Sequence, residues 1–335
     1  MTQFSSVRPW LAPLVPAYRL ALALRELELR TRLKPIRRLR WPVVSIGNLS
    51  TGGSGKTPLT IAMAKALVAC GLRVDVLSRG YGRRRSAIPL LVEPEGTAEQ
   101  FGDEPLLIAR EAGVPVYVAA DRYRAGLLAE RSPLSGFGFH LLDDGFQHRQ
   151  LARDVDILLL SQADLTDHLL PAGNLRETLH TAGRAQILAI PNDEPDVEEE
   201  IKSRGWAGAL WRLRRRMEIP PVDGPVVAFC GIARPAQFFQ GIESAGVKLA
   251  ARIAFPDHHR YTARDLGRLA AAARKAGASA LLTTEKDRVR IGALAAILPE
   301  SLALKTAQLC IEIKNQAEVI DRLITRLGGL RTFTS

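Results

Sequence analysis

Residues 42–61, PVVSIGNLSTGGSGKTPLTI, decide the fold of this chain. The apolar, β-branched start of the stretch is typical of a buried strand, and a helical pattern follows over residues 58–70. Between them lies a glycine-rich loop that ends in Lys56 and Thr57. A strand, a glycine-rich loop and a helix in this order predict a phosphate-binding loop, in which backbone N–H groups and a helix N-terminus surround phosphate oxygens.

The loop departs from the usual pattern G-x-x-x-x-G-K-[ST] at one position, because Ser50 stands where the first glycine is expected. Lys56 is suited to reach the β- and γ-phosphates, and the Thr57 hydroxyl is suited to bind Mg²⁺. The alternative is an ordinary glycine-rich turn with a chance Lys-Thr pair. The predicted nucleotide-binding residues are Ser50, Thr51, Gly52, Gly53, Ser54, Gly55, Lys56 and Thr57.

Length and composition predict a folded chain with two cores. The chain has 335 residues, of which 47% are hydrophobic and 24% charged, so it can bury two ordinary cores. We expect a basic amphipathic N-terminal helix over residues 1–40, a P-loop nucleotide-binding kinase domain over 41–208, and a smaller α/β domain with linker strands and a C-terminal helix over 209–335. The predicted fold class is therefore α/β, a P-loop NTPase-like α/β/α sandwich with a second, smaller α/β domain joined by a short β linker.

Hydrophobic runs place further elements along the chain. Strands are expected over residues 73–78, 114–119, 137–142, 156–160, 186–190 and 209–217, and then over 226–230, 247–254 and 280–283. Helices are expected near residues 235–244 and 262–276, and the acidic stretch 192–200 is expected to be a linker. The alternation of strands and helices favours parallel sheets.

The basic excess of the chain is concentrated at its N-terminus. The net charge is +11, and nine Lys and Arg residues precede Trp41 against two Glu residues. Residues 9–40 also carry many leucines with Trp10 and Tyr18, and they are too charged for a cleaved signal peptide. Such a helix suits the plane of an anionic membrane interface, but an amphipathic helix packed on the domain has the same pattern. No run of about 18 apolar residues predicts a transmembrane helix.

Acidic residues stand at two places where a phosphate-binding site would need them. The predicted strand over residues 137–142 runs into Asp143 and Asp144, and a strand ending in Asp is the magnesium-side partner expected of a phosphate loop. Asp103 and Glu104 open a predicted helix. They are candidates for base and metal roles, although the helix dipole alone would favour carboxylates there.

Arginine and histidine residues at loop positions complete the set of candidates. Arg79 lies in a glycine-containing loop after a predicted strand and could serve anionic substrate groups, or it could be part of a solvated arginine cluster. His148, His258 and His259 follow predicted strands, and an imidazole paired with a carboxylate can activate a hydroxyl near neutral pH. From spacing alone, each histidine is more often a surface or structural residue than a catalytic one.

A series of motifs resembles one family closely. GNLSTGGSGKTP, SRGYGR, GDEP, DDGFQH, LPAGNLRE, GIARP, FPDHHRYT and TTEKD follow one another between about residues 41 and 290, and together they resemble the tetraacyldisaccharide 4′-kinase family of lipid A biosynthesis. The resemblance implies an ATP-dependent lipid kinase that uses Mg²⁺ and phosphorylates the 4′-hydroxyl of a tetraacyldisaccharide 1-phosphate, which gives lipid IVA. It also implies two α/β/α domains joined by a two-stranded linker, with the site in the cleft between them.

Individual roles follow from the same resemblance, motif by motif. It implies that Asp103 is the catalytic base and that His258 supports it. The remaining implied site residues are Thr57, Glu104, Asp143 and Asp144 for the metal, Gln147, His148 and Glu177 for the cleft, and Ser50, Arg79 and Arg122 for nucleotide or substrate contacts.

The resemblance implies a location as well. A lipid with four acyl chains stays in the bilayer, so the enzyme is expected to lie peripherally at the cytoplasmic face of the bacterial inner membrane. Its expected partners are the lipid acceptor and the anionic membrane surface, with no nucleic acid and no obligate protein partner.

Two other functions remain open. A membrane-associated P-loop ATPase switch of the partitioning-ATPase type has a similar loop, but it needs a lysine where this chain has Thr51. A nucleic-acid-binding ATPase is suggested only by the net charge, because the chain has no recognisable nucleic-acid module.

Overall fold

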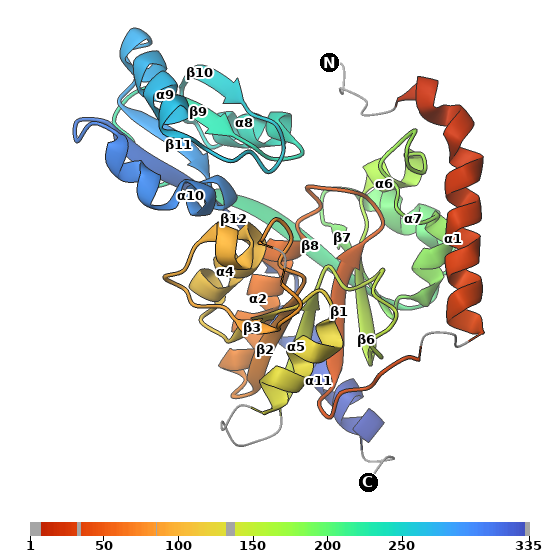
Figure 1. Ribbon diagram of the computed structural model, residues 1–335. Coiled ribbons are helices and arrows are strands. Elements are labelled where there is room, and N and C mark those ends of the chain that lie inside the picture. The colour runs from red at the N-terminus through yellow and green to blue at the C-terminus, as the bar shows by residue number, and fades with distance from the viewer. Residues whose placement is uncertain (1–7, 32–34, 85, 132–137, 332–335) are drawn as a thin grey trace.

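The computed structural model describes residues 8–31, 35–84, 86–131 and 138–331, and these form two units on one continuous sheet (Figure 1). The strands are β1 (Val43–Asn48), β2 (Arg73–Ser78), β3 (Leu90–Leu91), β4 (Val116–Val118), β5 (Gly138–Asp143), β6 (Val155–Leu159), β7 (Ile187–Pro191), β8 (Ala209–Glu218), β9 (Val226–Cys230), β10 (Leu249–Ala254), β11 (Ala280–Thr284) and β12 (Ala303–Ile313). Their order across the sheet is β10-β9-β11-β12-β8-β7-β6-β1-β5-β2-β4-β3.

Helices cover both faces of this sheet. They are α1 (Val15–Arg30), α2 (Lys56–Ala69), α3 (Ala98–Phe101), α4 (Asp103–Ala112), α5 (Arg122–Glu130), α6 (Gln162–Thr166), α7 (Pro195–Ser203), α8 (Pro235–Ser244), α9 (Ala263–Lys275), α10 (Glu285–Ile291) and α11 (Gln316–Arg331). Three 3₁₀ helices join them in the described part of the chain, η1 (Pro9–Leu14), η2 (Leu179–Arg184) and η3 (Gly292–Ile297).

The larger unit is built on β1 to β7 and the smaller unit on β9 to β11. In the larger unit the strands are parallel except β3, and in the smaller unit all are parallel. Strands β8 and β12 run between the units as an antiparallel pair, in which β8 also pairs with β7 and β12 with β11. The predicted α/β class, the P-loop NTPase-like sandwich and the β linker to a second α/β unit are therefore confirmed.

Alternating side chains explain the layers. Along β1, Val44 and Ile46 face the core under α2, whereas Val43 faces the core under α5. Along β9, Val226 packs under α8 and Val227 under α9. Successive side chains of a strand point to opposite faces, so a strand that is apolar throughout is buried between two helical layers.

The C-terminal helix packs on the larger unit. Ile320, Leu323 and Leu327 of α11 belong to the same buried core as Val44 and Leu59. This differs from the expectation that the helix is part of the smaller domain. The reason is that β12 carries the chain back from the smaller unit, so α11 begins beside α2.

The acidic stretch at residues 192–200 is a helix rather than a linker for much of its length. Residues Val197 and Ile201 of α7 are buried in a core of the larger unit. Their spacing puts both on one face of the helix, and the acidic side chains occupy the other positions.

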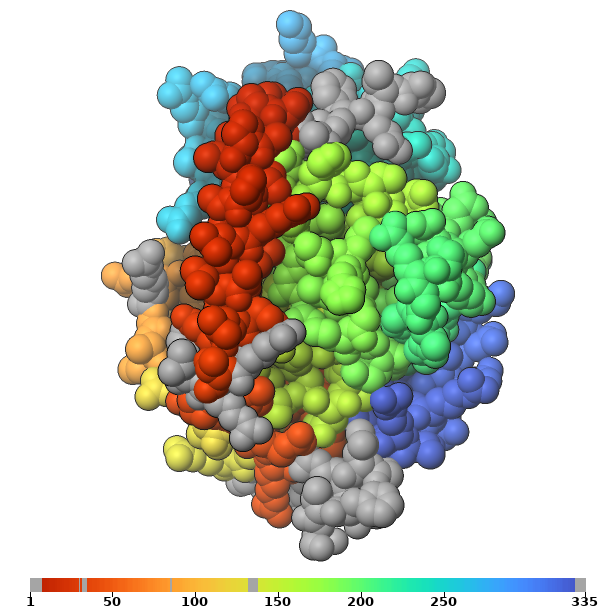
Figure 2. Space-filling view, turned by 90° about the vertical axis from the view of Figure 1, so that its right-hand side faces the viewer, coloured from red at the N-terminus to blue at the C-terminus, as the bar shows by residue number. Residues whose placement is uncertain are grey.

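Helix α1 lies on the outside of the larger unit. Val15, Tyr18 and Leu22 pack against the core that also holds Val197 and Ile201. Figure 2 shows α1 in red as a ridge across the surface formed by the green segments of the larger unit. Leu20, Leu24 and Leu27 are 62%, 55% and 56% exposed, so the packed helix still presents an apolar face outward.

Candidate active site

A cavity of about 820 Å³ lies between the phosphate loop and the smaller unit. The larger unit contributes residues 51–58, Arg79, Glu104, Asp143, Asp144 and Arg176 to its lining, and the smaller unit contributes Ala233, Arg234, His258, Lys286 and Arg290. Arg215, Met217 and Leu309 of the linker strands also line it. The carboxyl ends of β1, β2 and β5 meet here, which is where open α/β sheets bind their ligands.

The predicted phosphate loop joins β1 to α2. Gly55 stands before the first helical residue with a φ of 92°, a conformation that glycine adopts without a steric penalty. The Nζ atom of Lys56 lies 2.9 Å from Oδ1 of Asn48 and 3.6 Å from Oδ1 of Asp144. Thr57 is buried in the first turn of α2. The loop therefore brings a lysine, a hydroxyl and a helix N-terminus to one place.

Asp143 ends β5 beside this loop. Its carboxylate accepts hydrogen bonds from Thr60 (3.4 Å) and Ser78 (3.3 Å). Burial and the neighbouring charges of Glu104 and Asp144 raise the pKa of Asp143 to about 7. Three carboxylates therefore crowd one side of the cavity, and a cation among them would relieve their repulsion.

Asp144 is held by cations. Both of its oxygens accept hydrogen bonds from Arg176, at 3.0 Å and 2.8 Å. Burial alone would raise the pKa of Asp144, but the charges of Lys56 and Arg176 outweigh it and hold the pKa well below its usual range. Asp144 is therefore an ionised carboxylate next to the phosphate loop.

The residues fit a magnesium ion that arrives with a nucleotide. Among the described residues, no cluster of three His, Cys, Asp or Glu side chains is arranged to hold a metal. Mg²⁺ in nucleotide sites needs only one or two carboxylates, because phosphates and water supply the other ligands. Asp143, whose pKa the neighbouring acids raise, and the hydroxyl of Thr57 meet this smaller requirement.

Asp103 and His258 meet at the edge of the cavity, which His258 lines. Asp103 begins α4 in the larger unit, and Nδ1 of His258 in the smaller unit lies 3.2 Å from its Oδ2. This hydrogen bond raises the pKa of His258, while it and the charge of Arg290 lower the pKa of Asp103 against the effect of burial. His259 is turned away and pairs with Asp265 at 3.2 Å.

The sequence predictions did not include two cations of α10. Arg290 donates to Asp103 from Nε at 2.7 Å, and Lys286 pairs with Glu104 at 2.5 Å. The motif TTEKD was part of the family resemblance, so the signal for Lys286 was present, whereas Arg290 lies just past the motif.

A loop of the smaller unit also covers the phosphate loop. A Cβ atom added to Gly53 would lie 3.0 Å from Cγ and Cδ of Arg234, so the arginine side chain rests on the loop backbone. Nη2 of Arg215 donates to the carbonyl of Ser54 at 3.0 Å. Neither arginine was predicted, although Arg234 belongs to the GIARP motif.

Six of the predicted residues do not line the cavity: Asp103, which is buried behind His258, and five others around it. Asn48 connects two of them, because Nε2 of Gln147 donates to its carbonyl oxygen and its Nδ2 donates to Ser50. The other three are Arg122, His148 and Glu177, which are wholly or partly buried nearby. Burial and the charge of Arg122 lower the pKa of His148 to about 3, so this imidazole is neutral.

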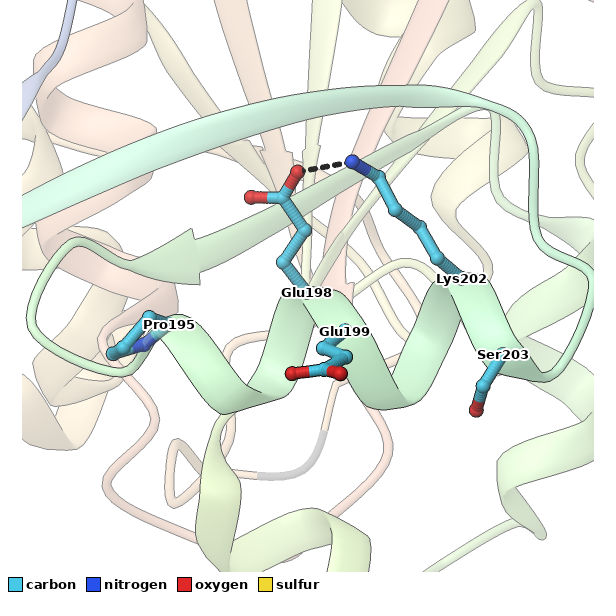
Figure 3. Close-up of a pocket in the computed structure, with 5 residues that line it drawn as sticks. All are labelled: Pro195, Glu198, Glu199, Lys202 and Ser203. Atoms are coloured by element: carbon cyan, nitrogen blue, oxygen red, sulfur yellow. Dashed lines mark ion pairs between the residues drawn. The ribbon is translucent and has the colours of Figure 1, made fainter.

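A second, more open hollow of about 450 Å³ lies over α7 (Figure 3). Pro195, Glu198, Glu199, Lys202 and Ser203 line it, and Glu198 pairs with Lys202 at 2.5 Å. It shares no lining residue with the cavity between the units, and none of the predicted site residues lies in it.

Comparison with known proteins gives the family. A model of the family described as tetraacyldisaccharide-1-P 4′-kinase matches residues 7–328. Tetraacyldisaccharide 4′-kinase of Koribacter versatilis is 40% identical over 297 residues, which cover 86% of this chain and 89% of the relative. The enzyme of the same name from Parvibaculum lavamentivorans is 38% identical over 84% of this chain and 81% of its own length.

A solved structure agrees with these relatives. The crystal structure of the "apo" form of LpxK from Aquifex aeolicus in complex with ATP has a TM-score of 0.72 and 31% identity to this chain. The match covers 95% of this chain and 98% of that one. Family match, relatives and shared fold agree over nearly the whole sequence, and the chain therefore belongs to the tetraacyldisaccharide 4′-kinase family.

Proposed function

We propose that this chain transfers the γ-phosphate of ATP to the 4′-hydroxyl of a tetraacyldisaccharide 1-phosphate, with Asp103 as the base. One observation carries the proposal: in a chain of this family, the phosphate loop and His258, which pairs with the buried Asp103, line the same cavity. Phosphoryl transfer needs positioned phosphates, neutralised charge and a group that takes the acceptor proton.

The nucleotide side consists of residues 50–57 and the cations near them. The backbone N–H groups of the loop would bind the phosphates of ATP, and Lys56 would contact the β- and γ-phosphates. Mg²⁺, when bound with the nucleotide, would neutralise phosphate charge beside Thr57 and Asp143, with Glu104 and Asp144 near it. Arg234, which rests on Gly53, would meet the bound phosphates from the side of the smaller unit.

The proton side consists of Asp103 and His258. Asp103 is ionised and can accept the proton of the 4′-hydroxyl as the hydroxyl oxygen bonds to the γ-phosphorus and the bond to ADP breaks. His258, 3.2 Å away, would hold the carboxylate and share the proton charge. Each role is thus given to a side chain whose ionisation its neighbours already favour.

Polar atoms without partners support an acceptor site near Gln147. Nε of Arg122, Oε1 of Gln147 and Nε2 of His148 are buried and have no hydrogen-bond partner within the described structure. Buried polar atoms are normally paired, so such a group suggests that a polar ligand completes it. We propose that the sugar hydroxyls and the phosphate of the acceptor lie here, with Arg79 at the cavity and Glu177 behind it.

Helix α1 supports a peripheral position on the membrane. In the described part of the chain, no helix is long and apolar enough to cross a bilayer. Leu20, Leu24 and Leu27 share one exposed face, and Trp10 before them is 74% exposed. Because arginines flank this face, we propose that α1 lies in the anionic interface at the cytoplasmic face of the inner membrane.

The same helix contacts the acceptor side of the site. The hydroxyl of Tyr18 donates to the carbonyl of Arg176 at 2.9 Å, and Arg25 donates to the carbonyl of Gln147. A helix seated in the interface would therefore place the loops that hold Asp144 and Gln147 close to a lipid head group.

Labelled phosphate transfer tests the proposed function. The assay follows γ-phosphate from ATP to tetraacyldisaccharide 1-phosphate in detergent micelles, with the wild type, D103A and H258A, and with H259A as the matched control. We expect labelled lipid from the wild type and H259A and very little from D103A. A folded wild type that binds ATP and labels no lipid would refute the kinase, and an active D103A would refute the base.

A further inference from the structure

Arg290 contacts the proposed base directly. Its Nε atom lies 2.7 Å from Oδ2 of Asp103, and its Nη2 atom also donates to this oxygen. The two side chains are 7% and 5% exposed. A hydrogen bond between a buried guanidinium and a carboxylate is charge-assisted and about twice as strong as a neutral one.

The guanidinium is also fixed within the smaller unit. Nη1 of Arg290 donates to the carbonyl of Gly231 at 2.6 Å and to Asp287 at 3.0 Å. Asp287 in turn accepts hydrogen bonds from the N–H of Gly231 at 3.1 Å and from Thr284 at 2.6 Å. The loop after β9 and the start of α10 therefore fix the orientation of the Arg290 side chain.

The contacts that reach the base end on one of its oxygens, and Nη2 of Arg290 also lies 3.2 Å from Nδ1 of His258. Nδ1 of His258 is 3.2 Å from Oδ2 of Asp103, the same oxygen that Arg290 contacts. Two groups of the smaller unit thus hold one oxygen of a carboxylate that belongs to the larger unit. With Oδ2 occupied, Oδ1 is the oxygen that can receive the hydroxyl proton.

We propose that Arg290 is the positioning residue of the base, and that it orients Asp103 only while the smaller unit is closed over the larger one. The inference rests on the proposed role of Asp103. An arginine is needed because its planar fork contacts Asp103 and Gly231 together, whereas a lysine has a single nitrogen. Proton transfer would then depend on closure of the two units.

Substitutions in α10 test this role. R290M and R290K are compared with R288M, a matched control on the same helix whose arginine donates to the carbonyl of Gly292. We expect kcat of R290M to fall about 100-fold, as for a misplaced catalytic group, while KM for ATP stays within about twofold. The kcat of R290K should fall less than that of R290M, and the kcat of R288M should equal that of the wild type. Thermal unfolding of each variant shows whether it is folded.

A double-mutant cycle separates positioning of the base from other effects. If Arg290 acts through Asp103, adding R290M to D103N should change the residual kcat by less than about threefold, because the two effects are not additive. If R290M lowers kcat by the same factor in the wild type and in D103N, the proposal is overturned. A folded R290M with a normal kcat, or one that changes only KM for ATP, would also overturn it.

The same assays distinguish this failure from failure of the proposed function. Wild-type protein that labels no lipid would refute the kinase, and D103N with full activity would refute the base. Wild-type transfer, an inactive D103N and a fully active R290M would leave both standing and refute only the role of Arg290.

Discussion

Lys56 of the phosphate loop donates a 2.9 Å hydrogen bond to Oδ1 of Asn48, eight residues earlier at the end of β1. The same oxygen accepts a 2.6 Å hydrogen bond from Nη2 of Arg176, which also holds Asp144. The amide of Asn48 thus positions both Lys56, which faces the phosphate site, and Arg176, which binds Asp144. Its polar neighbours are charged, so each contact counts for more than a neutral hydrogen bond.

Removal of this amide should therefore reduce catalysis without unfolding the protein. For Asn48→Ala we expect kcat/KM for ATP to fall about 10- to 100-fold, since hydrogen bonds to charged groups contribute roughly 1.5–3 kcal/mol each. Steady-state kinetics with varied ATP measures this. Asn48→Asp keeps the shape of the side chain and changes its charge, so it separates the two contributions. A kcat/KM of N48A equal to that of the wild type would refute the role of Asn48.

Arg234 should contribute to nucleotide affinity. Its side chain rests on Gly53 and lines the cavity, so its charge lies where phosphates are expected. For Arg234→Gln we expect KM for ATP to rise about tenfold, which corresponds to roughly 1.4 kcal/mol. The matched control is R252A in the same unit, an exposed arginine that pairs with Glu243. Equal KM values in both variants would contradict the assignment.

The metal requirement should depend on pH through Asp143. Burial, Glu104 and Asp144 raise its pKa to about 7, so its ionised fraction falls as the pH is lowered through that value. A carboxylate must be ionised to bind a metal. The Mg²⁺ concentration for half-maximal transfer should therefore rise as the pH is lowered from about 8 to about 6, by up to about tenfold for each pH unit. A flat response would count against Asp143 as the ligand.

The buried histidine of β5 should make stability depend on pH. Nδ1 of His140 lies 2.6 Å from Asp75, and its Nε2 lies 3.3 Å from Glu130. Burial alone would lower the pKa of His140, but these two carboxylates raise it from 6.5 to about 9. The folded protein then holds a proton that the unfolded chain releases at lower pH. The stabilisation is complete below about pH 6.5 and is lost as the pH rises through about 9.

Thermal unfolding across this pH range tests the histidine. The wild type should lose up to about 3 kcal/mol of stability between pH 6.5 and pH 9. His140→Gln should be less stable at neutral pH and should show a much smaller decline. A parallel decline in both proteins would assign the effect to other groups.

The outward face of α1 should govern binding to membranes. Replacing Leu20, Leu24 and Leu27 by serine leaves Val15, Tyr18 and Leu22 to pack on the larger unit. We expect co-sedimentation with anionic vesicles to weaken at least tenfold, because each buried leucine contributes about 1.5–3 kcal/mol. ATP binding should not change. The control removes exposed apolar side chains elsewhere, at Val68 and Ile297, and equal weakening by both sets would contradict a specific role for α1.

Local patterns predicted most of the fold because the strands of both units are short segments rich in apolar residues. The predicted bounds 73–78 and 235–244 are those of β2 and α8. Strand β12 was missed, because burial along it is irregular and its apolar residues are interrupted by Lys305, Gln308 and Glu312. It is a strand because it pairs with β8 and β11, and partners distant in sequence leave no local signal.

The sequence predicted those parts of the candidate site that lie within one motif. It did not predict contacts between segments that are distant in the sequence. The phosphate loop is a single stretch, so its residues were identified together. Arg290 and Asp103 are separated by 187 positions, and nothing near Arg290 in the sequence indicates a carboxylate partner. Asn48 was part of a recognised motif, but only the structure shows that its amide contacts Lys56 and Arg176.

The paired strands β8 and β12 have a mechanical consequence. Because six residue pairs join them in one hydrogen-bonded ladder, the two strands cannot slide along each other without breaking that ladder, and we expect them to act as the hinge between the units. We expect the smaller unit to move mainly toward or away from the phosphate loop. The contact of Arg234 with Gly53 and the contact of Arg290 with Asp103 would then form and break in a single motion. Hydrogen exchange of the two contact regions should accordingly slow together when a nucleotide binds, and independent slowing would show a looser joint.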